Sequence, residues 1–153
     1  MAKIWLMKSE PDVYSIDQLA KDKTTWWTGV RNYQARNFMM KEMELGDVVL
    51  FYHSNAEPPG IAGLGKVTHL AEPDPTQFEK KSEYFDPKAT KEKANWFCVQ
   101  VGFERKLEKL ISLEELRKNP KLQELLVLKK GQRLSIQPVE EVHYREILKM
   151  EKK

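Results

Sequence analysis

Short apolar runs separated by turn and capping residues recur along the chain, and runs of this length are typical of buried strands. The runs predict strands over 3–8, 48–53, 61–70, 96–103 and 133–137. Three glycines at positions 60, 63 and 65 predict a bulge, or the close approach of another backbone, at the start of the third run. The segment 71–93 is rich in proline and charge, and predicts a long ordered loop with one helical turn near Phe78.

Capping signals predict helices between these runs. Ser15 and Ser112 each begin a capping box, Asn32 is a suitable N-cap, and Pro138 suits a first helical position. The predicted helices run from Ser15 to about residue 21, from Asn32 through residue 42, from Ser112 to just before residue 120, and from Pro138 to about residue 150. Residues 122–128 are also compatible with helix. Because short antiparallel strands dominate this order, it predicts a mixed α/β domain, a compact barrel with peripheral helices.

Length and composition indicate one ordinary globular domain over residues 1–153. The chain is 41% hydrophobic and 32% charged, which is typical of a folded protein with its own core. The N-terminus becomes charged too early for a secretory signal, and no apolar run approaches the length of a membrane span. Cys98 is the only cysteine, so an intramolecular disulfide is excluded and a thiolate metal cluster is not expected. A reducing cytoplasm fits these features.

The charge is nearly balanced. The formal net charge is +3, and the first 60 residues hold seven Lys or Arg against eight Asp or Glu. That distribution is unlike a basic groove that neutralises many phosphates. Any contact with nucleic acid is therefore expected to be local and to depend on shape.

Four segments carry more polar and aromatic side chains than their predicted structure requires. They are Lys8-Ser9-Glu10-Pro11, the stretch 26–37 that opens with two tryptophans, Tyr52-His53-Ser54, and Tyr84-Phe85-Asp86-Pro87. Each also has a structural explanation: a strand end and turn, one core and one partly exposed tryptophan, a hydrogen-bonded histidine, or anchoring of a loop. Together they supply aromatic faces that stack on a base and polar groups that contact its edge.

The usual catalytic and cofactor motifs are missing from the sequence. The glycines at 60, 63 and 65 have the wrong spacing for a nucleotide-binding loop and lie in a predicted strand. The three histidines are far apart in sequence, which argues against a metal site. A Ser–His–Asp set from Ser54, His53 and Asp86 is weak, because adjacent strand residues point in opposite directions.

Several runs resemble the signatures of the EVE domain family, and the match extends over nearly the whole chain. The runs are Trp5-Leu-Met-Lys-Ser-Glu-Pro11, Gly29-Val-Arg-Asn-Tyr-Gln-Ala-Arg-Asn37 after Trp27, Phe51-Tyr-His-Ser54, Pro59-Gly-Ile61, Tyr84-Phe-Asp-Pro-Lys88, Trp96 and Arg133-Leu-Ser-Ile-Gln-Pro-Val139. The chain looks like a stand-alone bacterial form of this domain.

The resemblance implies a PUA-like fold, a small, mostly antiparallel β-barrel flanked by helices and related to YTH domains. YTH domains hold a methylated adenine in an aromatic cage, and EVE domains bind modified bases in DNA, including modified cytosines. The implied function is non-catalytic binding of a modified nucleobase, in DNA or RNA or as the free base. No cofactor, metal or membrane is implied, and the protein partners are left open.

The resemblance also implies a set of ligand-binding residues. Trp27 is the principal stacking wall, whereas Trp26 lies where the family does not insist on tryptophan and is left outside the site. The remaining residues are Ser9, Glu10 and Asn32 near the base edge, Tyr33 and Arg36 on the helix beside it, Tyr52, His53 and Ser54 on another side, and Tyr84, Phe85 and Asp86 as a lid. Trp5, by contrast, is expected in the core.

Two alternatives come from other functional classes. ASCH domains share the PUA-like fold, and some hydrolyse modified nucleosides with a lysine, a hydroxyl residue and a glutamate, which are the residue types of Lys8, Ser9 and Glu10. Three consecutive strand residues cannot all converge on one point, so such a site would need another acid. The other alternative is a protein–protein adaptor whose pocket is vestigial.

Overall fold

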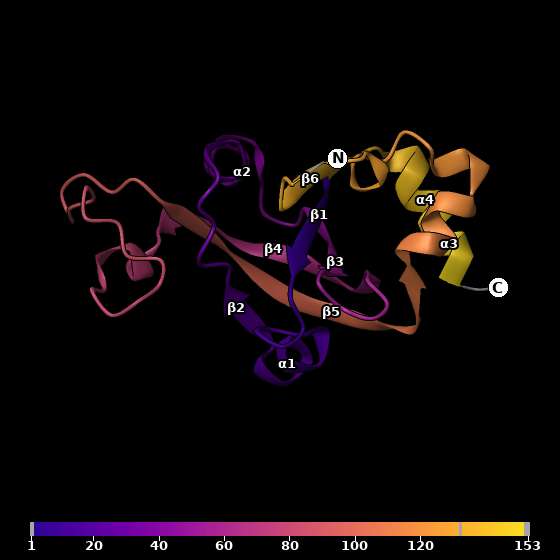
Figure 1. Cartoon of the computed structure of the whole chain (residues 1–153), viewed down its shortest axis with the longest axis horizontal. Helices are drawn as coiled ribbons and strands as arrows, with labels where there is room; N and C mark the ends of the chain where they lie inside the picture. The colour runs from indigo at the N-terminus through magenta and orange to yellow at the C-terminus, as the bar shows by residue number, and fades with distance from the viewer. Residues whose placement is uncertain (1, 132, 152–153) are drawn as a thin grey trace.

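The computed structural model describes residues 2–131 and 133–151, and a six-stranded sheet lies at its centre (Figure 1). The strands are β1 (Ile4–Ser9), β2 (Thr24–Trp26), β3 (Val48–His53), β4 (Gly60–Pro73), β5 (Phe97–Ser112) and β6 (Ile136–Val139), in the order β2-β5-β4-β3-β1-β6. All neighbours pair antiparallel except β1 and β3, which are parallel. The expected mixed α/β, mostly antiparallel architecture is confirmed. Within the described chain β2 and β6 remain the two edges, so the barrel is not closed by strand pairing.

Strands β4 and β5 form the long antiparallel pair of the sheet, and their register shifts at several points. Two of the shifts fall between Ile61 and Gly63 and between Leu64 and Gly65, as the glycine pattern predicts. A β-carbon on Gly63 would lie 2.5 Å from Ile16 Cδ1, and one on Gly65 would lie 2.6 Å from the carbonyl oxygen of Gly102. Both positions therefore require glycine, because neighbouring segments of the same chain approach the backbone too closely for a side chain.

Helices and shorter turns surround the sheet. They are α1 (Ile16–Asp22), α2 (Tyr33–Asn37) continuing into a π-helical turn (Phe38–Glu42), α3 (Leu113–Lys118), α4 (Glu141–Glu151), and 3-10 turns at Pro75–Phe78, Pro120–Leu122 and Leu126–Leu128. The three predicted caps are confirmed, because Ser15, Asn32 and Ser112 each accept the backbone N–H of the residue three positions on. The reciprocal bond of the capping box forms at Ser112, whereas the Gln18 side chain donates to Asp22 rather than back to Ser15. Figure 1 shows α3 and α4 together at one end of the sheet, and the loop between β4 and β5 extending at the other.

The structure differs from the predicted elements in the last strand and helix, in β2 and in the length of β5. Pro138 lies in strand β6 opposite Trp5 rather than at the start of a helix, and α4 begins only at Glu141. Strand β6 is an edge strand, where a residue without an N–H is tolerated. Strand β2 was not predicted, and β5 continues to Ser112, well beyond the predicted end at 103.

Strand alternation builds a core on each face of the sheet. Trp5 and Met7 point into one cluster, and Ile4 and Leu6 point into the other. Trp5 is 2% exposed, and its indole N–H donates to Asp47 Oδ2 at 3.0 Å, so its expected core position is confirmed. Among the described residues, none of the helices is long and apolar enough to cross a membrane.

Candidate functional site

A cavity of about 500 Å³ opens where the end of β1 approaches the segment that follows β2. Five stretches of chain line it, and they come from different parts of the sequence. The lining residues are Lys8, Ser9, Glu10, Val13, Tyr14, Thr25, Trp26, Trp27, Thr28, Gly29, Val30, Arg31, Ser54, Tyr84, Arg133 and Ser135. Of the residues expected to bind ligand, the structure brings together Ser9, Glu10, Trp27, Ser54 and Tyr84.

The end of β1 forms a polar wall of this cavity. Ser9 Oγ donates to the carbonyl oxygen of Tyr14 at 2.6 Å, and the Ser9 carbonyl oxygen accepts the N–H of Ser54 at 3.0 Å. Glu10 accepts a hydrogen bond from the amide of Asn55. In the described part of the chain, the hydroxyls of Ser54 and Ser135 have no hydrogen-bond partner. They are therefore free to contact a ligand.

Trp27 belongs to the cavity and to the core at once. Its ring packs edge-to-face on Phe51, with centroids 5.4 Å apart, and the residue is only 8% exposed. The neighbouring Trp26 is half-buried, packs against the His69 ring at 5.0 Å, and also lines the cavity. Trp26, which the resemblance leaves outside the site, therefore borders the same cavity as Trp27. Strand alternation separates the two rings, yet the cavity reaches both residues.

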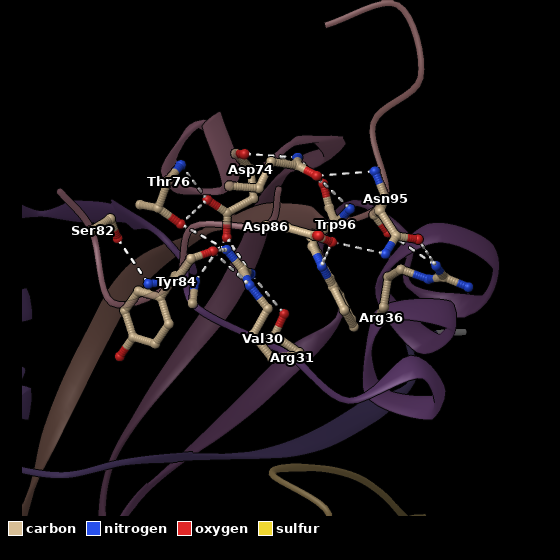
Figure 2. Close-up of polar contacts among 12 residues, drawn as sticks. Val30, Arg31, Arg36, Asp74, Thr76, Ser82, Tyr84, Asp86, Asn95 and Trp96 are labelled. Carbon is tan, nitrogen blue, oxygen red and sulfur yellow. Dashed lines mark hydrogen bonds and ion pairs between the residues drawn. The ribbon is translucent and has the colours of Figure 1, made fainter. Parts of the chain in front are cut away.

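The other aromatic wall is Tyr84, and it is held through its main chain. Arg31 Nη2 and Nε donate to the Tyr84 carbonyl oxygen at 2.7 and 3.1 Å, and Arg31 Nη1 donates to Asp74 at 3.2 Å (Figure 2). Asp74 is fully buried and also accepts the N–H of Gly29 at 2.8 Å. Burial raises the pKa of the Tyr84 phenol, so the ring enters the cavity uncharged. Arg31 is thus occupied in structure and is not free for a ligand.

Comparison with known proteins identifies the family. The model of the EVE domain matches residues 3–150. Human thymocyte nuclear protein 1 is 41% identical over 97% of this chain and 74% of its own length. The crystal structure of the human THYN1 protein in complex with DNA that contains 5-methylcytosine superposes with a TM-score of 0.91, at 42% identity and 99% coverage of both chains. The chain belongs to the EVE domain family.

The motif segment that contains Asn32, Tyr33 and Arg36 lies outside the cavity. Tyr33 stacks on Trp96 with centroids 4.8 Å apart, and the Arg36 guanidinium lies 4.7 Å from the Tyr33 ring. Asn32 caps α2 by accepting the N–H of Ala35. None of Asn32, Tyr33 and Arg36 is among the residues that line the cavity. Tyr33 instead contacts Trp96, and Arg36 donates to the carbonyl oxygen of Asn95, both in the loop between β4 and β5.

Asp86 anchors that loop rather than lying over the cavity. Its carboxylate accepts the indole N–H of Trp96 at 2.8 Å and the amide of Asn95 at 3.1 Å (Figure 2). The bond from Asn95, the bond from the Lys88 N–H and the bond from Trp96 lower the pKa of Asp86. The neighbouring Phe85 is partly buried and does not line the cavity either. Only Tyr84 of the predicted lid reaches the cavity.

The strand residues Tyr52 and His53 also have structural roles. Tyr52 is buried in the core cluster on the opposite face, with Leu6 and Leu50, and burial raises the pKa of its phenol. His53 Nε2 accepts the N–H of Ile16 at the start of α1, at 3.2 Å. Burial lowers the pKa of His53. Because adjacent residues of β3 face opposite sides of the sheet, Tyr52 and His53 do not point into the same pocket.

Three cations line the cavity, and sequence reasoning assigned none of them to the binding site. Arg31 is neutralised by Asp74. Lys8 and Arg133 have no ion-pair partner within the described residues, and burial lowers the pKa of Lys8. Among the residues that line the cavity, Glu10 is the one with an acidic side chain. The signal was available, since Lys8 and Arg133 both lie in the motifs that identify the family.

Among the described residues, three features bear on a nucleophilic or metal-dependent reaction. Lys8, Ser9 and Glu10 all line the cavity, but adjacent strand residues leave the backbone in opposite directions, so the side chains of Lys8 and Ser9 diverge. Burial raises the pKa of the Cys98 thiol to about 12, which disfavours the reactive thiolate. Within the described chain no group of His, Cys, Asp and Glu is placed to hold a metal ion. An ASCH protein variant from Zymomonas mobilis superposes with a TM-score of 0.56 at 7% identity, over 97% of this chain and 98% of its own, which shows a shared fold alone.

Proposed function

We propose that this EVE domain binds a modified base in DNA, 5-methylcytosine being the first candidate, and holds the base in the cavity between Trp27 and Tyr84 without transforming it. The observation that carries this proposal is the complex of the related human THYN1 protein with DNA containing 5-methylcytosine. The two aromatic walls of the cavity support it, because stacking on aromatic side chains contributes ~1–3 kcal/mol per base.

The remaining lining fits a base that is still attached to a strand. The hydroxyls of Ser54 and Ser135 can bond the polar edge of the base. Arg133 is exposed at the cavity, so it is placed to contact a flanking phosphate. Val13 and Val30 add apolar surface that suits a methyl group. Stacking and edge contacts hold an extruded base, and a flanking cation positions its strand.

A direct test compares labelled duplexes that differ at one base, by fluorescence anisotropy. We expect tighter binding to the duplex with 5-methylcytosine than to the duplex with cytosine, by about fourfold or more, because burying one methyl group contributes roughly 0.8 kcal/mol. A matched RNA and the free base serve as further competitors. Equal affinity for both duplexes, or none for either, would contradict the proposal.

Two tyrosines provide a matched pair of variants. Tyr84 lines the cavity, whereas Tyr33 is 57% exposed and lies outside it. We expect Tyr84→Ala to weaken binding of the modified duplex and Tyr33→Ala to leave it unchanged. The reverse result would move the site to the Tyr33 surface.

A second measurement separates a binding protein from a hydrolase. Incubation with methylated, hydroxymethylated and N4-acylated nucleosides is followed by mass spectrometry, and we expect every nucleoside to be recovered unchanged. Turnover that is abolished in Lys8→Ala or in Glu10→Ala would instead establish a hydrolase.

A further inference from the structure

Gly29 lies directly against the Tyr84 ring. A β-carbon on Gly29 would be 2.8 Å from Tyr84 Cζ, 2.9 Å from Cε2 and 3.2 Å from Cε1, well inside the 3.5–4.0 Å at which carbon atoms normally pack. The backbone of Gly29 also has a φ of +85°, which favours glycine. Any side chain at this position would therefore push the ring of Tyr84 away from its place beside the cavity.

A buried carboxylate fixes both partners of this contact. Asp74 accepts the N–H of Gly29 and the Arg31 guanidinium, and Arg31 in turn donates two hydrogen bonds to the Tyr84 carbonyl oxygen. Thr76 donates its N–H and its hydroxyl to the same carboxylate, at 2.8 and 2.6 Å. Figure 2 shows the guanidinium between Asp74 and the main chain of Tyr84. The segment that carries Tyr84 is thus tied to the segment that carries Gly29.

We propose that Gly29 is a positioning residue that determines ligand affinity by seating the Tyr84 ring, while Arg31 and Asp74 hold the chain on either side. The inference rests on the proposed function, because it assumes that Tyr84 contacts the bound base. A wall that is already in place when the base arrives lowers the entropy lost on binding. Glycine at position 29 is then part of the recognition of the base, although it has no side chain.

Gly46 offers a matched control. Its φ is +86°, nearly that of Gly29, but a β-carbon there would meet no atom within 4 Å. Gly29→Ala and Gly46→Ala therefore introduce the same backbone strain, and only the first displaces a ring. We expect Gly29→Ala to weaken binding of the 5-methylcytosine duplex about tenfold, the scale of one aromatic stacking contact. We expect Gly46→Ala to bind as the wild-type protein does.

A double-mutant cycle shows whether Gly29 acts through Tyr84. In a Tyr84→Ala background, Gly29→Ala should have no further effect, because there is no ring left to displace. Arg31→Lys provides a second variant, since lysine cannot donate both bonds to the Tyr84 carbonyl oxygen, and it should also weaken binding. Wild-type affinity in Gly29→Ala, or an equal loss in the Tyr84→Ala background, would overturn the inference.

Crystal structures of the two alanine variants give a readout that needs no ligand. We expect the Tyr84 ring to move in Gly29→Ala and to stay in Gly46→Ala, and an unmoved ring in Gly29→Ala would overturn the inference whatever the protein binds. Failure of the wild-type protein to prefer the 5-methylcytosine duplex would contradict the proposed function instead. The two failures are thus distinguishable.

Discussion

Trp5 and Trp27 belong to the same core cluster, but only Trp27 also borders the cavity. Trp27 is 8% exposed and packs on Phe51, so this wall of the cavity is also part of the core. We expect Trp5→Ala and Trp27→Ala each to lower the free energy of unfolding by ~3–5 kcal/mol, the usual range for a buried aromatic ring.

Urea unfolding with and without the 5-methylcytosine duplex distinguishes the two tryptophans. Ligand should stabilise Trp5→Ala, because its cavity is intact, and should not stabilise Trp27→Ala. Trp27→Phe, which keeps an aromatic ring, is the control for stacking. Equal ligand stabilisation of both alanine variants would place the binding site elsewhere.

His53 makes the stability of the protein depend on pH. Its neutral Nε2 accepts the N–H of Ile16, and burial lowers the pKa of His53, whereas the nearby Asp17 raises it and Lys106 lowers it. A lowered pKa means that the unfolded chain binds the proton more readily. The contribution of His53 is therefore complete above its ordinary pKa of about 6.5 and is lost as the pH falls from there toward the folded-state value.

Unfolding free energies at about pH 7.5 and about pH 5.5 test this dependence. We expect the wild-type protein to be less stable at the lower pH, and His53→Gln to lose less, because glutamine accepts the same N–H without titrating. An identical loss in both proteins would assign the pH dependence to other groups.

At the scale of elements, the loop between β4 and β5 depends on Asp86. Its carboxylate binds both Trp96 and Asn95, and Trp96 supports the stacked Tyr33. We expect Asp86→Ala to lower the free energy of unfolding by about 1–3 kcal/mol, since Trp96, Asn95 and the Lys88 N–H lose their acceptor. We expect the variant to bind the modified duplex unchanged below its melting temperature. Thermal melts and anisotropy check this, and a specific loss of affinity in the folded variant would return Asp86 to the binding site.

Local signals predicted local structure well. The caps at Ser15, Asn32 and Ser112 depend on residues within one turn, and the sequence alone identified them. Strand β2 is three residues long and exists only because it pairs with β5. Its short sequence carries no periodic signal, so it could not be predicted. The same is true of Pro138, whose strand is specified by β1.

The residues of the cavity show the same difference between local signals, which the sequence reveals, and contacts between distant segments, which it does not. Ser9, Trp27 and Tyr84 come from motifs that the sequence singled out, and the structure places all three at the cavity. Tyr33 and Arg36 follow Trp27 closely in the sequence, yet helix α2 directs both side chains to Trp96 rather than to the cavity. The contact between Gly29 and Tyr84 joins residues 55 positions apart. No spacing rule reveals it, because it depends on how the loop folds back on the segment after β2.

At the scale of the whole molecule, the charges predict how binding responds to salt. Outside the cavity, several surface lysines and arginines are paired with acidic side chains. Lys66 pairs with Glu104, and Lys118 pairs with Glu114. At the cavity, Lys8 and Arg133 have no such partner in the described chain. A net charge of +3 and two free cations indicate contact with few phosphates.

The slope of log affinity against log salt measures the number of phosphates contacted. For about two contacts in B-DNA we expect a slope of about −2, and Arg133→Gln should reduce its magnitude by about one. Arg133→Lys keeps the charge and should keep the slope. The preference for 5-methylcytosine should persist in Arg133→Gln, because a phosphate contact carries no information about the base. A slope of about −6 or steeper would instead indicate a broad basic surface, and the shallow, local contact inferred from this charge distribution would then be wrong.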